Sequence, residues 1–184
     1  MQEAEHPGPS AGSPAEPQDG ALRVRAATPR DVPTLLELFR QLAEYERLEH
    51  ELRATERGLA AALFSTKPAA EALIAERDGA ALGYALYFNT FSSFLTSTGI
   101  WLEDLFVVPA HRREGVGRAL LSAVAARVLE QGGERLEWAA LDWNELALGF
   151  YRRLGARTMG EWITHRLDGE ALARVAVQSG GKRR

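Results

Sequence analysis

The stretch that most constrains this chain is a hydrophobic strand followed directly by a basic, glycine-containing turn and a helix. Leu102–Val108 is rich in β-branched and aromatic residues, which predicts a strand. From Val116 onward apolar residues recur at helical spacing, which predicts a helix. The helix N-terminus has unpaired N–H groups and a partial positive charge, so strand, turn and helix together predict a site for a phosphorylated ligand.

The turn itself has the composition that such a ligand needs. Gly115 and Gly117 have no Cβ, so a pyrophosphate group can approach the main chain closely. Arg112, Arg113 and Arg118 add positive charge around it.

Three phosphate-binding patterns compete at this turn. The Walker pattern needs Lys-Ser/Thr where Arg118-Ala119 stands, and the dinucleotide fingerprint needs a third glycine where Leu120 stands. The third pattern is Arg/Gln-x-x-Gly-x-Gly/Ala, and residues 112–117, Arg-Arg-Glu-Gly-Val-Gly, match it. With its flanking strand and helix, this turn resembles the pyrophosphate loop of the GNAT N-acetyltransferases. An ordinary tight turn is the alternative.

The rest of the chain predicts one domain over residues 21–178, with disordered tails at 1–20 and 179–184. Predicted strands lie at Leu22–Ala26, Ala72–Glu76, Ala81–Asn89, Ile100–Val108 and Arg135–Leu141, with a strand or hairpin within Thr158–Leu167. Predicted helices run from Thr28 or Asp31 to about Tyr45, from Thr55 to Phe64, from Glu114 to about Gln131, from Asn144 to Leu154 and from Gly169 to about Val177. A turn at Asp78-Gly79 and a loop at Phe91–Gly99 separate strands. This order predicts an α+β or mixed α/β fold.

Composition excludes several classes of function. The net charge of −3 argues against a general nucleic-acid-binding protein. The absence of cysteine excludes disulfides, thiolate metal sites and a cysteine nucleophile, and the four histidines have no metal-ligand spacing, so we expect no metal. No apolar run is long enough to span a membrane and no secretory signal is recognisable, so we expect a cytoplasmic protein without membrane contact.

Glu103 and Asp104 are adjacent carboxylates in an otherwise apolar strand. Neighbours in a regular strand point to opposite faces, so both can face one way only if the strand is irregular. An edge strand or an internal ion pair is one explanation. The other is that a carboxylate accepts the proton of an amine, because an alkyl ammonium ion cannot attack a carbonyl.

Asn144 and Tyr151 are seven residues apart on one predicted helix, about two turns, and therefore share a face. Asn144 is equally well explained as a helix N-cap. Tyr151 is either a core residue with a hydrated hydroxyl or a proton donor to a departing thiolate.

The sequence around these residues resembles the last GNAT motif, with Asn144-Glu145 followed by residues 150–156, Phe-Tyr-Arg-Arg-Leu-Gly-Ala. Within that superfamily the chain resembles the spermidine/spermine and thialysine N-acetyltransferases from about Val24 to Ala176. The matching segments are Leu42–Glu46, Trp101–Val107 and Asp142–Glu145. Ser92 stands where some polyamine-acetylating relatives have an aspartate, as in relatives that prefer thialysine or lysine-like amines.

The resemblance implies the GNAT fold, with a mostly antiparallel central sheet flanked by helices. It also implies direct transfer from acetyl-CoA to an amine in a ternary complex. The amides of Leu105, Phe106 and Val107 are then expected to hold the pantetheine arm. Residues implied to contact the rest of the cofactor are Arg112, Arg113, Glu114, Gly115, Val116, Gly117, Arg118 and Asn144.

For the reaction itself the resemblance implies that Glu103 accepts the amine proton through water and that Tyr151 protonates the CoA sulfur. Residues implied to line a negative acceptor pocket are Tyr45, Glu46, Glu103, Asp104, Trp138 and Glu161, with Trp162 as a further wall. The family also suggests a homodimer.

We therefore expect an acetyl-CoA-dependent N-acetyltransferase for a small cationic amine, such as a lysine-like compound, a diamine or a polyamine. Two alternatives stay open. The first is a non-catalytic CoA-binding or interaction module, and the second is an acetyltransferase for protein or peptide amines.

Overall fold

The computed structural model describes residues 20–178, which form two compact units divided between Ala139 and Ala140. The predicted tails lie outside the described residues, apart from Gly20, whose amide donates to the Asp78 carboxylate at 2.8 Å. That residues 21–178 act as a single domain stays a prediction.

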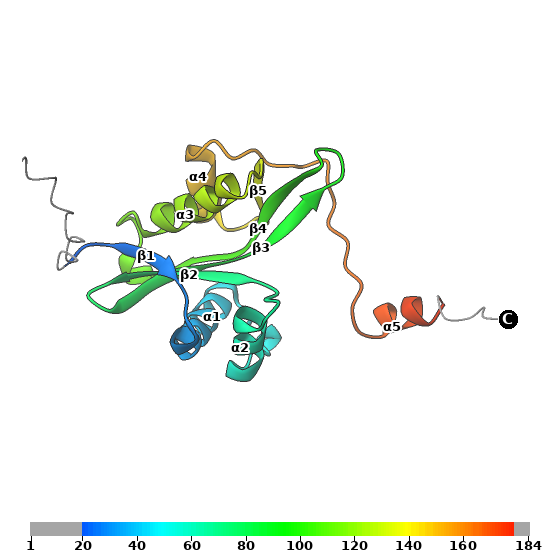
Figure 1. Cartoon of the computed structure of the whole chain (residues 1–184), viewed down its shortest axis with the longest axis horizontal. Coiled ribbons are helices and arrows are strands. Elements are labelled where there is room, and N and C mark those ends of the chain that lie inside the picture. The colour runs from blue at the N-terminus through cyan, green and yellow to red at the C-terminus, as the bar shows by residue number, and fades with distance from the viewer. Residues whose placement is uncertain (1–19, 179–184) are drawn as a thin grey trace, which may run out of the picture. The chain divides into compact units, whose positions relative to one another are not determined.

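The first unit is built on a five-stranded sheet with the strand order β1-β2-β3-β4-β5 (Figure 1). The strands are β1 (Arg23–Ala26), β2 (Glu71–Arg77), β3 (Ala80–Ser92), β4 (Ser97–Val107) and β5 (Arg135–Trp138). Neighbours from β1 to β4 pair antiparallel, and β5 pairs with β4 in parallel. The predicted α+β fold with a mostly antiparallel sheet is confirmed.

Three α-helices belong to this unit: α1 (Val32–Glu46), α2 (Glu56–Phe64) and α3 (Val116–Glu130). Helices α1 and α2 cover one face of the sheet and α3 covers the other (Figure 1). The apolar side of α1, including Leu35, packs with Tyr84 of β3 and Phe106 of β4 in one buried core. The amphipathic pattern of α1 therefore predicts both its existence and the side that it buries.

The two hairpins differ in how well the sequence predicts them. Asp78 and Gly79 both have positive φ angles, 51° and 78°, as the predicted two-residue turn requires. The predicted loop Phe91–Gly99 is too long, because β3 and β4 continue their pairing to Ser92 and Ser97. The Ser92 hydroxyl accepts a hydrogen bond from the Leu95 amide at 3.3 Å and so stabilises this turn.

The second unit contains α4 (Glu145–Arg153) and α5 (Gly169–Gln178). The strand or hairpin predicted within Thr158–Leu167 is wrong, since no strand forms there in the described chain. The apolar Trp162 and Ile163 are neighbours and break the alternation of a half-buried strand, and no strand of this unit is present among its described residues to complete a ladder. Across both units, no described helix has the length and apolarity to cross a membrane.

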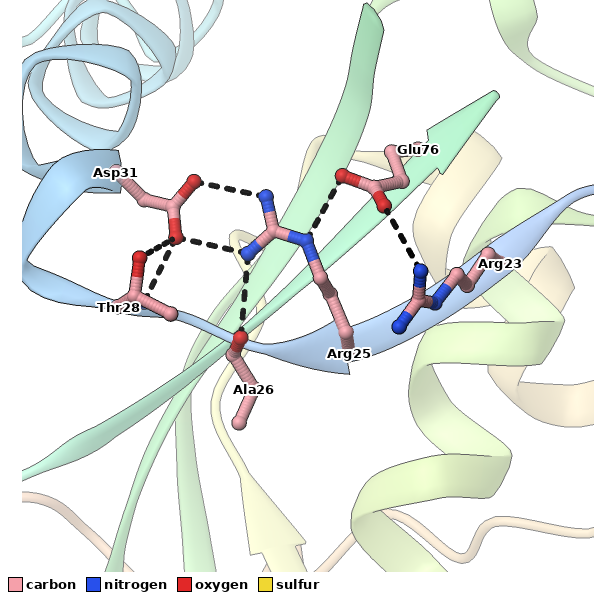
Figure 2. Close-up of polar contacts among 6 residues, drawn as sticks. All are labelled: Arg23, Arg25, Ala26, Thr28, Asp31 and Glu76. Carbon is pink, nitrogen blue, oxygen red and sulfur yellow. Dashed lines mark hydrogen bonds and ion pairs between the residues drawn. The ribbon is translucent and has the colours of Figure 1, made fainter. Parts of the chain in front are cut away.

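An ion-pair network fixes the start of α1 against the sheet (Figure 2). The Arg25 guanidinium donates two hydrogen bonds to Asp31, at 2.7 and 2.8 Å, and its Nε donates to Glu76 at 2.8 Å. Thr28 donates to the same Asp31 carboxylate from its amide and its hydroxyl. These contacts hold the pKa of Asp31 well below its usual range, mainly through the Arg25 hydrogen bonds.

Candidate active site

The pairing of β4 with β3 is interrupted at the two adjacent carboxylates. Leu86 of β3 pairs with Asp104, whereas the next residue, Tyr87, pairs with Leu102. Glu103 is therefore an extra residue in β4, a β-bulge. Such a bulge shifts the alternation of side chains by one position. Two residues of β4 an even number of positions apart therefore point to different faces of the sheet when the bulge lies between them.

This bulge brings both carboxylates to one face of the sheet. Asp104 pairs with Leu86, which packs against the core beneath α1. Glu103 accepts a hydrogen bond at 2.9 Å from the indole N–H of Trp101, which pairs with Phe88 on the same face as Leu86. In an uninterrupted strand the two carboxylates would point to opposite faces, so the bulge makes them a pair.

Asp104 lies in an environment that disfavours its charge. Burial raises its pKa to about 6, and the neighbouring charges of Glu103 and Glu46 add to this rise. The buried Tyr84 hydroxyl donates to Asp104 Oδ2 at 3.1 Å, which opposes the rise because it stabilises the charged form. Burial also raises the pKa of Glu46, the last residue of α1.

The three carboxylates of Glu46, Glu103 and Asp104 have no cationic partner within the described residues. Two other carboxylates of the sheet are paired: Glu76 with Arg25 and Glu137 with Arg135. Glu46 and Asp104 are half-buried, and half-buried carboxylates without a counterion attract a cation more strongly than carboxylates exposed to water. The site is therefore suited to an ammonium group.

The main chain of β4 has a free edge next to these acids. Its parallel pairing with β5 runs from Gly99 to Leu102. On that side no described strand pairs with Glu103–Val107. This segment is therefore open to a ligand that hydrogen-bonds to a strand.

The ladder geometry indicates which groups face that edge. The Val108 amide donates to the Leu82 carbonyl at 2.9 Å. Hydrogen-bonded and non-hydrogen-bonded pairs alternate in an antiparallel ladder. Leu105 and Val107 therefore direct their N–H and C=O groups toward the free edge, whereas Phe106 directs its groups toward β3.

The turn between β4 and α3 presents a row of main-chain amides. Within the described residues, none of the N–H groups of Arg113 to Arg118 donates to an acceptor. Arg113 and Gly115 have positive φ angles of 68° and 86°, and Gly115 is the N-cap of α3. The position of a Cβ on Gly115 is open space. Free amides, an uncovered glycine and a helix N-terminus fit a pyrophosphate group.

Arg112 joins this turn to α1 and to the free edge of β4. Its guanidinium lies over the ring of Tyr45, 4.4 Å from the centroid, and its Nε donates to the Val107 carbonyl at 3.3 Å. The predicted phosphate-loop residue and the predicted acceptor-pocket residue are thus in direct contact.

Glu114, the one acidic residue of the turn, is neutralised by neighbours. Its carboxylate lies 2.8 Å from Arg77, at the end of β2, and 3.5 Å from His111. The hydrogen bond from Arg77 is the main reason that the pKa of Glu114 lies below its usual value. The Arg77 pairing offsets a charge that would otherwise repel a phosphate.

The structure brings most of the predicted site residues together in the first unit. Trp138 also lies there, half-buried at the end of β5 and paired with Leu102. Asn144, Tyr151 and Glu161 lie in the second unit. That these three share a site with Glu103 stays a prediction.

In the second unit, Asn144 acts as an N-cap, since its side chain accepts a hydrogen bond from the Ala147 amide at 3.2 Å. The cap explanation is therefore confirmed, without excluding a further contact to a ligand. Tyr151 lies half-buried within α4, and Glu161 is exposed in the irregular segment before α5.

Two residues of the site are missed by sequence reasoning. Tyr84 is recognisable as part of an apolar strand face, but its contact with Asp104 depends on the strand register. Arg77 carries no local signal for its contact with Glu114, 37 residues away.

Comparison with known proteins gives a consistent result. Residues 32–156 match the model of the acetyltransferase (GNAT) family. The chain is 33% identical to L-ornithine N5-acetyltransferase NATA1 of Arabidopsis thaliana, over 83% of this chain and 87% of that protein. It is 33% identical to thialysine N-epsilon-acetyltransferase of Mus musculus, over 85% and 98%.

Among solved structures, an integron cassette protein from the mobile metagenome of V. cholerae superposes with a TM-score of 0.71 at 26% identity, over 84% of this chain and 97% of that one. The predicted resemblance and the observed fold therefore agree with the family match. The chain belongs to the acetyltransferase (GNAT) family.

Proposed function

We propose that this protein transfers the acetyl group of acetyl-CoA to a primary amine of a small cationic acceptor, such as a lysine-like compound, a diamine or a polyamine. Two relatives at 33% identity are named for the acetylation of ornithine and thialysine. The observation that carries the proposal is the group of unneutralised carboxylates, Glu46, Glu103 and Asp104, on one face of the sheet.

The cofactor is held by main-chain groups in this proposal. The free amides of Arg113 to Arg118 bind the pyrophosphate, and Arg118 adds charge. The Leu105 and Val107 amides, at the free edge of β4, hold the pantetheine arm and polarise the thioester carbonyl. Asn144 makes a further contact. Acetyl-CoA supplies the acetyl group in the activated form of a thioester.

The acidic group binds and prepares the amine. Glu46 and Asp104 attract the ammonium form, and Tyr45 and Trp138 line the pocket with them. Glu161 is assigned to the pocket by the family resemblance alone. Glu103 is exposed and fixed by Trp101, so it is suited to accept the amine proton through water. Tyr151 donates a proton to the departing sulfur.

The test is a panel of amines with acetyl-CoA and detection of free thiol. It comprises thialysine, ornithine, lysine, putrescine, spermidine and spermine, together with a basic peptide. We expect turnover of a small amine and a much lower rate for the peptide. Acetyl-CoA binding without thiol release from any amine would instead support the non-catalytic module.

Two substitutions test the assigned roles. Tyr151→Phe should lower kcat while acetyl-CoA binding by calorimetry stays nearly unchanged, and wild-type turnover would remove Tyr151 from the acid role. Glu103→Gln should shift the pH-rate profile to higher pH, because less of the amine is deprotonated at a given pH. An unchanged profile would remove Glu103 from the base role.

We also propose that the protein is a homodimer. The segment that includes α5 exposes large apolar side chains, among them Trp162 and Ile163 with 74% and 78% of their surface exposed and Val177 with 75%. Surfaces of this kind are typical of contacts with another protein chain. Light scattering coupled to gel filtration should give twice the mass of 20.2 kDa, and a monomer at micromolar concentration would contradict the proposal.

A further inference from the structure

The turn before α3 has backbone φ angles of alternating sign. Arg113 and Gly115 have positive φ angles of 68° and 86°, whereas the φ of Glu114 between them is not positive. Successive residues of opposite hand direct their N–H groups into one concave site for an anion. This conformation is strained at Arg113, because a left-handed backbone brings the Cβ of any residue other than glycine close to the following carbonyl oxygen.

Main-chain hydrogen bonds do not hold this turn in its conformation. The amides of Arg113 to Arg118 donate to no acceptor within the described residues. Val116 is buried in the core and fixes the end of the turn that enters α3. Among the described contacts of residues 113–118, the one side-chain hydrogen bond is donated by Arg77 Nη1 to Glu114 Oε2, at 2.8 Å. The middle of the turn is therefore attached to the rest of the fold through the Glu114 side chain.

The Glu114 carboxylate contacts two basic side chains from outside residues 113–118. Arg77 lies 2.8 Å from its Oε2, and His111 Nδ1 lies 3.5 Å from its Oε1. Both oxygens are thus beside protein groups. The contact with the cofactor that the family resemblance implies for Glu114 is therefore open to its amide, while its carboxylate holds the turn.

Arg77 belongs to a well-defined part of the sheet. It is the last residue of β2 and pairs with Ala80 of β3 across the two-residue turn at Asp78-Gly79. Its side chain is 31% exposed and its Nε is buried. A tight hairpin therefore reaches the phosphate turn through one ion pair, although the two paired residues are 37 positions apart in sequence.

We propose that Arg77 is a positioning residue for the pyrophosphate of acetyl-CoA: it holds Glu114 and thereby keeps the amides of the turn directed at the ligand before the ligand binds. This inference rests on the proposed function and adds a residue that acts on the cofactor only through another. A turn that is already ordered binds more tightly, because binding does not have to order it. The role goes beyond neutralising Glu114, since a neutral turn without this contact would be free to relax at Arg113.

The first test measures the affinity for CoA by calorimetry, with no amine present. Arg77→Ala should raise the Kd about fivefold, the effect expected of a partly exposed ion pair. Arg77→Lys keeps a charge that can pair with Glu114 and should recover most of the affinity. The thermal midpoint of Arg77→Ala should fall by no more than about 3 °C, so the loss of affinity is not a loss of fold.

Arg127→Ala is the matched control. Arg127 also contacts a glutamate, Glu130 at 3.4 Å, but it lies in the last turn of α3, at the opposite end from the phosphate turn. The control loses the same charge and should keep the wild-type Kd. An unchanged Kd for Arg77→Ala, or an equal rise for both alanine variants, would overturn the inference.

A double variant separates positioning from charge compensation. The pair of Arg77 and Glu114 has no net charge, and neither has the variant that combines Arg77→Ala with Glu114→Ala. If Arg77 positions the turn, the double variant should bind CoA about threefold or more weakly than wild type. If Arg77 only cancels the charge of Glu114, the double variant should bind CoA as tightly as wild type, and the inference is then refuted.

A truncated donor shows where the effect acts. Acetyl-pantetheine has the thioester arm of acetyl-CoA but no pyrophosphate. Arg77→Ala should raise the KM for acetyl-CoA about fivefold with kcat unchanged, and it should leave kcat/KM for acetyl-pantetheine unchanged. An equal loss with both donors would show a merely structural role for Arg77.

These outcomes separate the inference from the proposed function. If the wild type binds no CoA or acetylates no amine, the proposed function fails. If it does both and Arg77→Ala binds CoA equally well, the function stands and positioning by Arg77 is refuted.

Discussion

Replacing Asp104 by asparagine should stabilise the fold while it damages the site. A carboxyl whose pKa is raised by folding keeps its proton in the folded state over a pH range in which the unfolded chain has lost it. Stability contributed by this group therefore falls as the pH rises from about 4 to about 6. An asparagine side chain at this position has no charge at any pH, so the Asp104→Asn variant should not show this loss.

The size of the effect follows from the two pKa values. A rise from 3.8 to about 6 corresponds to about 3 kcal/mol of disfavoured ionisation, since each pH unit is worth about 1.4 kcal/mol. Asp104 keeps some contact with solvent, which screens its charge, so we expect about 1–2 kcal/mol in practice. The asparagine side chain can still accept the hydrogen bond of Tyr84 through its carbonyl oxygen.

Urea unfolding at pH 4, 6 and 7.5 measures this difference directly. The variant and the wild type should have similar free energies of unfolding at pH 4, and the variant should be more stable by about 1–2 kcal/mol at pH 7.5. Asp142→Asn makes the same change at an exposed carboxylate and is the matched control. A difference that does not change with pH, or a variant that is less stable at pH 7.5, would refute the assignment of a buried, unneutralised charge.

Three further substitutions test residues near the site: one at the start of α1, one in β3 and one in the turn before α3. Asp31→Asn should lower the free energy of unfolding, measured with urea, by about 2 kcal/mol at pH 7. Because Arg25 holds the pKa of Asp31 low, this difference from wild type should shrink as the pH falls below about 4. Gly83→Ala should lower the free energy of unfolding by about 3 kcal/mol, because the new Cβ would lie 2.3 Å from the Phe106 carbonyl oxygen. An unchanged midpoint of thermal unfolding would contradict this close packing. Arg113→Gly should raise the free energy of unfolding by about 1 kcal/mol, because glycine adopts the positive φ of 68° without strain. The same variant should have a higher KM for acetyl-CoA, because it loses a positive charge.

Local sequence signals account for most of the fold. The apolar side of α1 and the turn at Asp78-Gly79 depend on neighbouring residues alone, and both are as predicted. The errors in the predicted strands occur where pairing with another strand determines the secondary structure. The hairpin strands continue to Ser92 and Ser97 because the partner strand stabilises polar residues that look like a loop, and Thr158–Leu167 lacks a partner among the described residues that would make it a strand.

The site is predictable in its composition but not in its geometry. The adjacent acids Glu103 and Asp104 are visible in the sequence, and so is the amide-rich turn before α3. The bulge that turns both acids to one face cannot be read from β4 alone, because it is a mismatch between two strands. The same holds for Tyr84, whose contact with Asp104 spans 20 residues of sequence.

The free edge of β4 has a consequence for how the protein behaves in solution. Unpaired N–H and C=O groups in an extended segment are a template for any strand, including one from another copy of the same chain, and such edges promote aggregation. Arg112 counters this at Val107 by occupying its carbonyl oxygen. Charged Glu103 and Asp104 discourage a foreign strand at the other end. If CoA binds along this edge as proposed, it would cover the segment that these three side chains protect only in part, and purified protein should then keep best with CoA in its storage buffer.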